Sequence, residues 1–384
     1  MPTARDVLAG ARLVDHHCHG VTAAALSRSD LERLLTEGPE PAGGAGSGFD
    51  TAIGAALRRW CAPVLDLPAH APSNDYVARR AELGSAEANR RLLAAAGLDE
   101  LLVDAGYQPA DPLPADALAA AAGGRLRQIL RLESVAEEVA ASGVAADGFT
   151  AAVTERLAER AAGAVALKSV AAYRVGLDLD SAPPSRAEVT AASGHWLDRA
   201  GPRPRLADPV LIRHLWWTGI ELGLPLQLHT GFGDPDLRLH RSDPALLTDF
   251  CAAVSGTGIP VVLLHCYPYH RQAAYLAAVF PDVYVDLGLT LNHVGARAGA
   301  VLAETMELAP YGKLLYSSDA FGLAELYFLG AVQFRTALGE LLDRQVARGD
   351  LAAGDAARYA MLPAAGTARH VYRLDRQEGA GRRS

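Results

Sequence analysis

Asp15, His17 and His19 are spaced by two residues at the end of the apolar run Leu13–Val14. On a β-strand this spacing would put all three side chains on one face. Two imidazoles so close together at a strand end can bind a divalent cation of the zinc type. A His-x-His pair also arises by chance, so the hypothesis needs support from residues elsewhere in the chain.

That support comes from three later residues that end apolar runs: His229, His265 and Asp319. Each also has an ordinary structural explanation, because a strand-end histidine can be a hydrogen-bonded core residue and an aspartate can cap a helix. Their repetition in this order is hard to obtain by accident. Together with the His-x-His pair they predict a metal site.

Lysine is rare in this chain. Only Lys168 and Lys313 are lysine among the 36 basic residues, and the others are arginine. A lysine amine can be deprotonated and modified whereas a guanidinium cannot, so a lysine kept in such a chain deserves an explanation. Lys168 lies within the strand-like run 164–173, and we expect it in the site. Lys313 precedes its run, and we expect it to be structural.

Short runs rich in Val, Leu, Ile and Tyr predict eight buried strands, which are 13–20, 101–107, 125–134, 164–173, 225–232, 260–268, 283–290 and 313–320. Stretches with helical spacing lie between them. Strand and helix alternating eight times indicate an α/β protein with a (β/α)8 TIM barrel, in which the strand ends carrying the candidate ligands share the catalytic face. A doubly wound open sheet is the alternative. It is weakened because no Gly-x-Gly-x-x-Gly follows the first strand.

We predict one barrel domain over residues 1–374, followed by a disordered polar tail at 375–384. The long interval 21–100 predicts a helical insert with a Gly/Pro/Ser-rich break at 38–48. In a barrel this insert would project from the catalytic face, so we expect a lid or a wall of the pocket. A purely structural helical subdomain remains the alternative.

Composition narrows the class of protein. Half of the residues are hydrophobic, which allows a sizeable core, and the net charge of −8 argues against a nucleic-acid partner. No apolar run approaches the roughly 18 residues of a membrane span, and the N-terminus lacks a signal-peptide pattern. The four cysteines are scattered, which suits a reducing compartment. We therefore expect a cytoplasmic protein that acts on a small molecule, with a homo-oligomer left open.

With these motifs the chain resembles the amidohydrolase superfamily, and more closely amidohydrolase family 2. Within that family it is similar to the amidohydrolase half of proteins fused to a glutamine synthetase-like domain, a domain that is not seen in this sequence. The segments that carry the resemblance are LKSVAAYR (167–174), PLQLHTGFGDPDLRL (225–239), VVLLHCYPYHRQAAYLA (261–277), FPDVYVDLGL (280–289) and LLYSSDAF (314–321).

The resemblance implies roles for the matching positions. His17, His19, His229 and Asp319 would bind a divalent metal, for which we favour zinc over manganese or iron. Asp319 would also act as general base. His265 would hydrogen-bond the attacking water or the developing oxyanion, or bind a second metal.

Two residues leave alternatives open. Lys168 would be a carbamylated bridge in the two-metal branch of the superfamily, although it could also bind a substrate carboxylate or pair with Asp286. We favour a single metal ion. Asp15 could orient one of the imidazoles.

The candidate substrate-binding residues lie on strand three or follow strands four to six, and they are Arg131, Glu133, Tyr173, Arg174, Arg238 and Tyr267. An arginine in such a pocket suits a carboxylate through its bidentate geometry. Alternatively, Arg131 and Glu133 pair with each other.

The resemblance implies a hydrolase that cleaves a C–N amide bond, with a γ-glutamyl amide as the specific candidate. Non-oxidative decarboxylation by the same kind of site is the alternative. A non-catalytic scaffold barrel is the third hypothesis, and a converging set of ligands speaks against it.

Overall fold

A computed structural model describes residues 2–377 of the chain. Eight strands follow one another in chain order within one sheet. They are β1 (Leu13–Cys18), β2 (Leu98–Asp104), β3 (Arg125–Arg131), β4 (Ala164–Ser169), β5 (Leu226–His229), β6 (Val261–Leu264), β7 (Val283–Asp286) and β8 (Leu314–Leu315). β1 pairs with β2 in parallel. The four successive pairs from β3–β4 to β6–β7 are also parallel. Parallel neighbours require a crossover segment each time, so the alternating pattern predicted from the sequence is confirmed.

Most strands end earlier than the hydrophobic runs suggested. His265 directly follows β6, and Asp319 lies in the loop after the short strand β8. Both residues have a left-handed backbone, with φ of 69° and 49° respectively. An extended strand cannot continue through such a conformation, and therefore these two candidate ligands occupy loops rather than strands.

Helices fill the intervals between strands. The α-helices are α1 (Ala4–Gly10), α2 (Arg28–Arg33), α3 (Ala52–Val64), α4 (Ser73–Ala96), α5 (Ala115–Ala122), α6 (Leu132–Ala141), α7 (Ala146–Ala161), α8 (Ala171–Arg174), α9 (Arg186–Leu197), α10 (Pro209–Glu221), α11 (Thr248–Val254), α12 (His270–Val279), α13 (Thr290–Val294), α14 (Ala298–Thr305), α15 (Ala324–Arg348), α16 (Ala353–Met361), α17 (Thr367–Val371) and α18 (Leu374–Gln377). Short helical turns are η1 (Pro41–Gly44), η2 (Gly48–Asp50), η3 (Leu239–Arg241), η4 (Pro244–Leu247), η5 (Gly295–Arg297), η6 (Tyr311–Lys313) and η7 (Leu362–Gly366).

Local sequence signals account for several of these helices. At the start of α10, the Asp208 side chain accepts hydrogen bonds from the backbone N–H groups of Val210 and Leu211, and Pro209 occupies the first turn. Both features favour a helix start, because the first N–H groups of a helix lack partners within it. The helix then buries Leu215 among other apolar residues of one face.

The described chain divides into two compact units. The first comprises residues up to Arg127, Gly233–Pro235 and Asp286–His370, and the second comprises Gln128–Phe232, Asp236–Val285 and the residues from Val371 onward. The single-domain assignment therefore stays a prediction. The expected tail begins inside α18, and residues 378–384 lie outside the described part of the chain.

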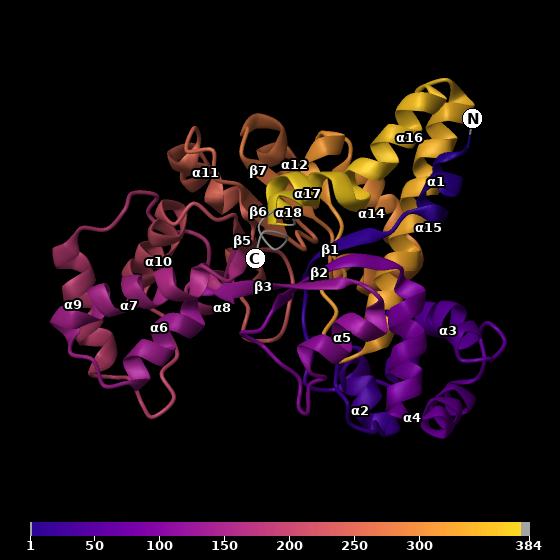
Figure 1. Cartoon of the computed structure of the whole chain (residues 1–384), viewed down its shortest axis with the longest axis horizontal. Coiled ribbons are helices and arrows are strands. Elements are labelled where there is room, and N and C mark those ends of the chain that lie inside the picture. The colour runs from indigo at the N-terminus through magenta and orange to yellow at the C-terminus, as the bar shows by residue number, and fades with distance from the viewer. Residues whose placement is uncertain (1, 378–384) are drawn as a thin grey trace. The chain divides into compact units, whose positions relative to one another are not determined.

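In the first unit, the N-terminal helix α1 lies against α15 and α16 from the C-terminal region (Figure 1). The backbone N–H of Ala4 donates to the Asp343 carboxylate at 2.7 Å, and Ala4 and Leu8 are buried. This contact joins the N-terminal helix to α15 within the first unit.

The predicted helical insert is confirmed as helical and consists of α2, η1, η2, α3 and α4, with the short turn η1 in the Gly/Pro-rich break. Helix α4 contacts α15, where the buried Arg80 donates to the Glu325 carboxylate through Nε at 2.7 Å. Its role as a lid stays a prediction.

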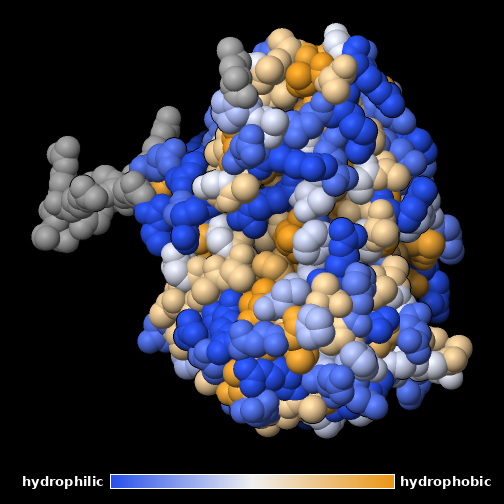
Figure 2. Space-filling model, turned by 90° about the vertical axis from the view of Figure 1, so that its right-hand side faces the viewer, coloured by the Kyte–Doolittle hydropathy of each residue, from blue (hydrophilic) through white to orange (hydrophobic). Residues whose placement is uncertain are grey.

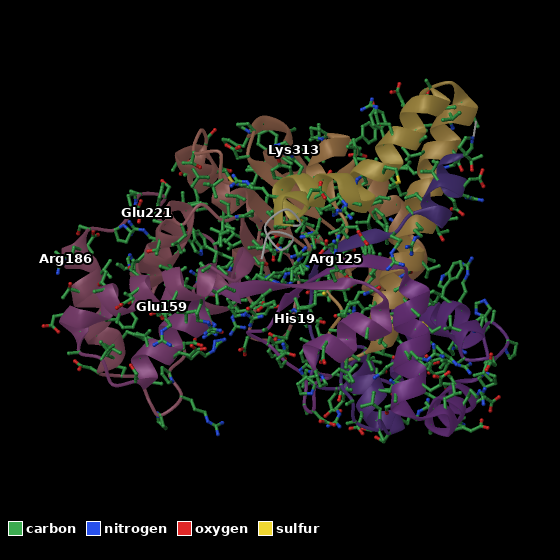
Figure 3. All side chains as sticks on the ribbon, in the orientation of Figure 1. His19, Arg125, Glu159, Arg186, Glu221 and Lys313 are labelled. Atoms are coloured by element: carbon green, nitrogen blue, oxygen red, sulfur yellow. The ribbon has the colours of Figure 1, made fainter. Side chains whose placement is uncertain are left out.

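The exposed surface is mixed in character. Figure 2 shows a face with mainly hydrophilic side chains and hydrophobic ones scattered among them. Figure 3 shows Glu159, Arg186 and Glu221 on the helices α7, α9 and α10, and all three residues are exposed. Among the helices of residues 2–377, none combines the length and the apolar character that crossing a membrane would need.

Candidate metal centre

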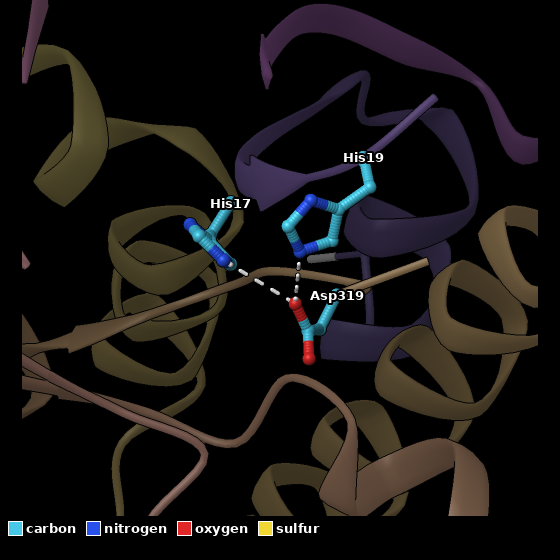
Figure 4. A group of neighbouring side chains, drawn as sticks. All are labelled: His17, His19 and Asp319. Atoms are coloured by element: carbon cyan, nitrogen blue, oxygen red, sulfur yellow. Dashed lines mark ion pairs between the residues drawn. The ribbon is translucent and has the colours of Figure 1, made fainter. Parts of the chain in front are cut away.

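His17, His19 and Asp319 converge in the first unit (Figure 4). The Nε2 atoms of His17 and His19 lie 3.3 and 3.4 Å from Oδ1 of Asp319, and the candidate ligand atoms all lie within 4.8 Å of one another. Both histidines are buried. Two imidazole nitrogens and one carboxylate oxygen that lie this close together fit a zinc-type cation. They leave coordination positions for another ligand and for water.

Two contacts hold His19 in its orientation. Its Nδ1 lies 3.2 Å from the backbone carbonyl of Asp104, at the end of β2, and the Tyr327 hydroxyl donates to the carbonyl of His19 itself. A proton on Nδ1 that is donated to this carbonyl leaves the lone pair on Nε2 for a cation. The neighbouring strand therefore selects the tautomer that a metal ligand needs.

The loop that carries Asp319 continues to pair with β1 beyond the end of β8. The Asp319 N–H donates to the His17 carbonyl at 3.0 Å, and the His19 N–H donates to the Ala320 carbonyl at 2.9 Å. Helix α15 is preceded by Leu323 at its N-cap, so Asp319 does not cap it. A non-glycine residue at positive φ is strained, and such residues concentrate at functional sites.

The contacts of Asp15 differ from the prediction that its carboxylate orients an imidazole. The pairing of β1 with β2 has a register shift between Asp15 and Cys18, which is the mark of a bulge. The Asp15 carboxylate accepts hydrogen bonds from Ser318, through its N–H at 2.9 Å and its hydroxyl at 2.5 Å. Asp15 thus anchors the residue directly before Asp319. Burial raises the pKa of Asp15 to about 7, against the opposing effect of the Ser318 hydrogen bonds.

Sequence reasoning missed His16. Its Nε2 lies 2.9 Å from Oδ2 of Asp286, and both side chains are fully buried. The Ser317 hydroxyl donates to the same carboxylate. Asp286 had been considered as a partner of Lys168. The only signal in the sequence was a third histidine in the motif, and it carried no information about a partner so distant along the chain.

The second unit brings together two further candidate ligands. His229 ends β5, His265 follows β6, and their ring centroids lie 4.6 Å apart. The ring of Tyr173 lies 4.5 Å from that of His229. Both histidines are buried, with exposed fractions of 5% and 1%. The ends of β5 and β6 therefore place these two imidazoles side by side, and their role as ligands stays a prediction.

Lys168 lies within β4 and is buried, with an exposed fraction of 2%. In the strand register it stands opposite Arg131 on one side and Gln227 on the other. Gln227 is two residues before His229, so strand alternation places Lys168 in the same row as His229. Lys313, by contrast, directly precedes β8, whereas Asp319 follows that strand.

The family model described as Amidohydrolase matches residues 14–374. This chain belongs to the amidohydrolase family. A solved structure from Lactobacillus casei, described as that of a metal-dependent hydrolase, is 31% identical and superposes with a TM-score of 0.86, covering 98% of this chain and 99% of that one. The likeness confirms the (β/α)8 barrel architecture predicted from the sequence.

Two other relatives extend the comparison. Protein fluG of Emericella nidulans is 36% identical over 217 residues, which cover 53% of this amidohydrolase but only 24% of the relative. A uronate isomerase from Bacillus halodurans is 12% identical, with a TM-score of 0.62 over 96% of this chain and 95% of that one. At this identity the second comparison shows the fold alone.

Glu133 of the amidohydrolase, a predicted substrate-binding residue, is fully buried. Its Oε1 accepts hydrogen bonds from the Ser169 hydroxyl at 2.5 Å and from the Val170 N–H at 2.9 Å. Burial raises the pKa of the Glu133 carboxyl, and the hydrogen bond from Ser169 opposes that effect. These bonds give Glu133 a structural role at the end of β4 that the sequence did not predict.

The other predicted substrate-binding residues differ in their surroundings. Arg174 donates to the Glu137 carboxylate through Nη1 at 2.8 Å, so that acid already neutralises it. The Tyr267 ring lies parallel to that of His270 with a centroid distance of 5.7 Å. Arg238 is exposed and directly precedes η3. Tyr173 is the member of the set that lies against a candidate ligand, His229.

Proposed function

We propose that this amidohydrolase uses a divalent cation, preferably zinc, to cleave the C–N bond of an amide that carries a carboxylate. A γ-glutamyl amide is the specific candidate. The observation that carries the proposal is the convergence of His17, His19 and Asp319 within 4.8 Å. The amide class and the γ-glutamyl candidate are what the family resemblance implies, and an arginine in such a pocket would suit the carboxylate of that substrate.

In this proposal His17 and His19 bind the cation through Nε2, and Asp319 and His229 complete the set. When bound, the cation supplies Lewis-acid chemistry that lowers the pKa of a water toward neutrality and polarises the amide carbonyl. Asp319 accepts the proton of the attacking water and passes it to the leaving nitrogen. His265 donates a hydrogen bond to the oxygen on which negative charge develops.

The products decide between hydrolysis and the alternative reaction. We expect a panel of γ-glutamyl amides to yield free amine or ammonia together with glutamate, while release of carbon dioxide from carboxylate substrates would show a decarboxylase instead. The substrate is expected to be a small molecule met in the cytoplasm. The oligomeric state is left open.

His229→Ala tests the ligand set. We expect its zinc affinity, measured by metal analysis after dialysis against graded chelator, to fall more than roughly tenfold, because even residues that only support a ligand contribute that much. Activity should fall with it. His195→Ala, on an exposed position of α9, is the matched control and should retain both. Full zinc occupancy in His229→Ala would show that the ligand assignment is wrong.

Lys168 tests the number of metal ions. We expect about one ion per chain, unchanged by bicarbonate, with Lys168→Arg binding as much as the wild type. Arginine cannot be carbamylated, so a carbamate bridge would be lost in this variant. Lys313→Arg, which changes the only other lysine, is the control. A rise toward two ions with bicarbonate, absent only in Lys168→Arg, would replace the one-metal proposal by the bridged one.

A further inference from the structure

Two aromatic side chains of the first unit lie beside the metal cluster. Tyr107 belongs to the loop after β2, and Phe321 belongs to the loop after β8. Their rings are stacked, with centroids 4.5 Å apart and an interplanar angle of 19°. Each ring also meets the His19 ring edge to face, at 6.0 Å from Tyr107 and 5.9 Å from Phe321. We call Tyr107 and Phe321 the aromatic wall.

The aromatic wall is unusual because part of it faces water. Tyr107 is 52% exposed, whereas most large apolar side chains of the described residues are buried. Leaving apolar surface in water is unfavourable, so an exposed ring that borders a candidate metal ligand requires a reason. Holding His19 in place is not that reason, because the Asp104 carbonyl and the Tyr327 hydroxyl already do so.

We propose that the aromatic wall determines specificity by binding a planar, unsaturated and uncharged group of the substrate next to the bond that is cleaved. The proposal rests on the metal site proposed above. Aromatic rings attract such groups through offset stacking and edge-to-face contacts. Because the two rings stack on each other, each offers one face and its edges. The edges carry the positive side of the ring quadrupole and the faces the negative side, so a planar unsaturated group can contact both, whereas a cation is attracted to a face alone.

The test uses two metal-binding probes that differ in one group. Benzohydroxamate and acetohydroxamate bind a metal through the same two oxygens, but one carries a phenyl ring and the other a methyl group. Titration calorimetry on the zinc-loaded protein gives both dissociation constants without any turnover. We expect the wild type to prefer benzohydroxamate, and Tyr107→Ala and Phe321→Ala each to reduce this preference about two- to tenfold. Zinc content and acetohydroxamate affinity should stay within about twofold of the wild type.

Further variants separate recognition from structure. Tyr107→Phe keeps the ring and should keep the preference, while Phe321→Leu keeps apolar volume, removes the π-face and covers the case in which Phe321→Ala does not fold. Tyr275→Ala on α12 removes a ring that is also 52% exposed and should change nothing.

The outcomes distinguish this inference from the proposed function. If the Tyr107 and Phe321 variants bound both probes more weakly by the same factor, the rings would serve the metal site. If the preference for benzohydroxamate stayed unchanged, the rings would not contact the ligand. Either result overturns the inference. Zinc binding with discrimination between the probes, but without hydrolysis of any amide, would reject the amide assignment and leave the aromatic wall supported. A wild type that binds no zinc would reject both.

Discussion

Asp319→Asn is expected to reduce amide hydrolysis by roughly 10²- to 10⁴-fold, because it removes the group proposed to transfer the proton from water to the leaving nitrogen. Zinc affinity should fall as well, since a neutral amide oxygen replaces the carboxylate that lies 3.3 and 3.4 Å from the two imidazoles. The fold should persist, because asparagine tolerates the positive φ of this position. Initial rates at saturating zinc, compared with metal content, measure the two effects separately.

Asp111→Asn is the matched control for this substitution. Asp111 also has a positive φ, 51° against 49° for Asp319, but its side chain is exposed in the loop after β2. The same chemical change should therefore leave zinc affinity and rate unaltered. If Asp319→Asn retained more than about a tenth of the rate at full zinc occupancy, another group would have to be the base.

Arg80→Ala is expected to destabilise the protein by about 3–5 kcal/mol, because it leaves a buried charge without its partner. Glu325 is fully buried, and its Oε1 accepts hydrogen bonds from Arg80 at 2.7 Å and from the Tyr76 hydroxyl at 3.1 Å. Arg80 also donates to Asn89, whose amide donates to the Thr22 carbonyl at 2.9 Å. The loss should appear as a lower midpoint of urea denaturation.

Arg79→Ala, one residue earlier on α4, provides the comparison. Arg79 pairs with Asp66 and Glu82, whose side chains are 60% and 70% exposed, so its removal should cost less than about 1 kcal/mol. The double variant Arg80→Met with Glu325→Leu should recover much of the stability lost in Arg80→Ala, since no isolated charge remains. Equal effects of Arg79→Ala and Arg80→Ala would contradict the assignment of a buried ion pair.

The barrel was predictable from local patterns, and so was the convergence of His17, His19 and Asp319 as candidate ligands. The eight apolar runs predicted the strands because burial on both faces of a parallel strand imposes a continuous hydrophobic run. The position of His229 at the end of its run placed it correctly, since the carboxyl ends of parallel strands share one edge of the sheet. The helical insert was recognisable from its helical spacing and from the Gly/Pro-rich break within it.

The exact ends of the strands were less predictable. The runs continued through His265 and Asp319, whereas β6 ends directly before His265, β8 ends at Leu315, and both residues have a left-handed backbone. Hydrophobic character does not report φ, because the same side chain can be buried from a strand or from a strained loop. The two candidate residues were therefore expected on extended strands but lie in loops with a left-handed backbone.

Sequence patterns alone predicted which residues lie at or beyond the strand ends and, with them, a candidate metal site. The partners of those residues emerged only when the chain was folded. Asp15 anchors Ser318, His16 meets Asp286, and the rings of Tyr107 and Phe321 stack on each other. Each of these contacts joins residues far apart along the chain, from different strands or the loops after them. The register of β1 against β2 also shifts between Asp15 and Cys18, within the segment that carries the first candidate ligands. Periodicity describes one element at a time, so contacts of this kind follow from the register between elements and not from the pattern within any of them.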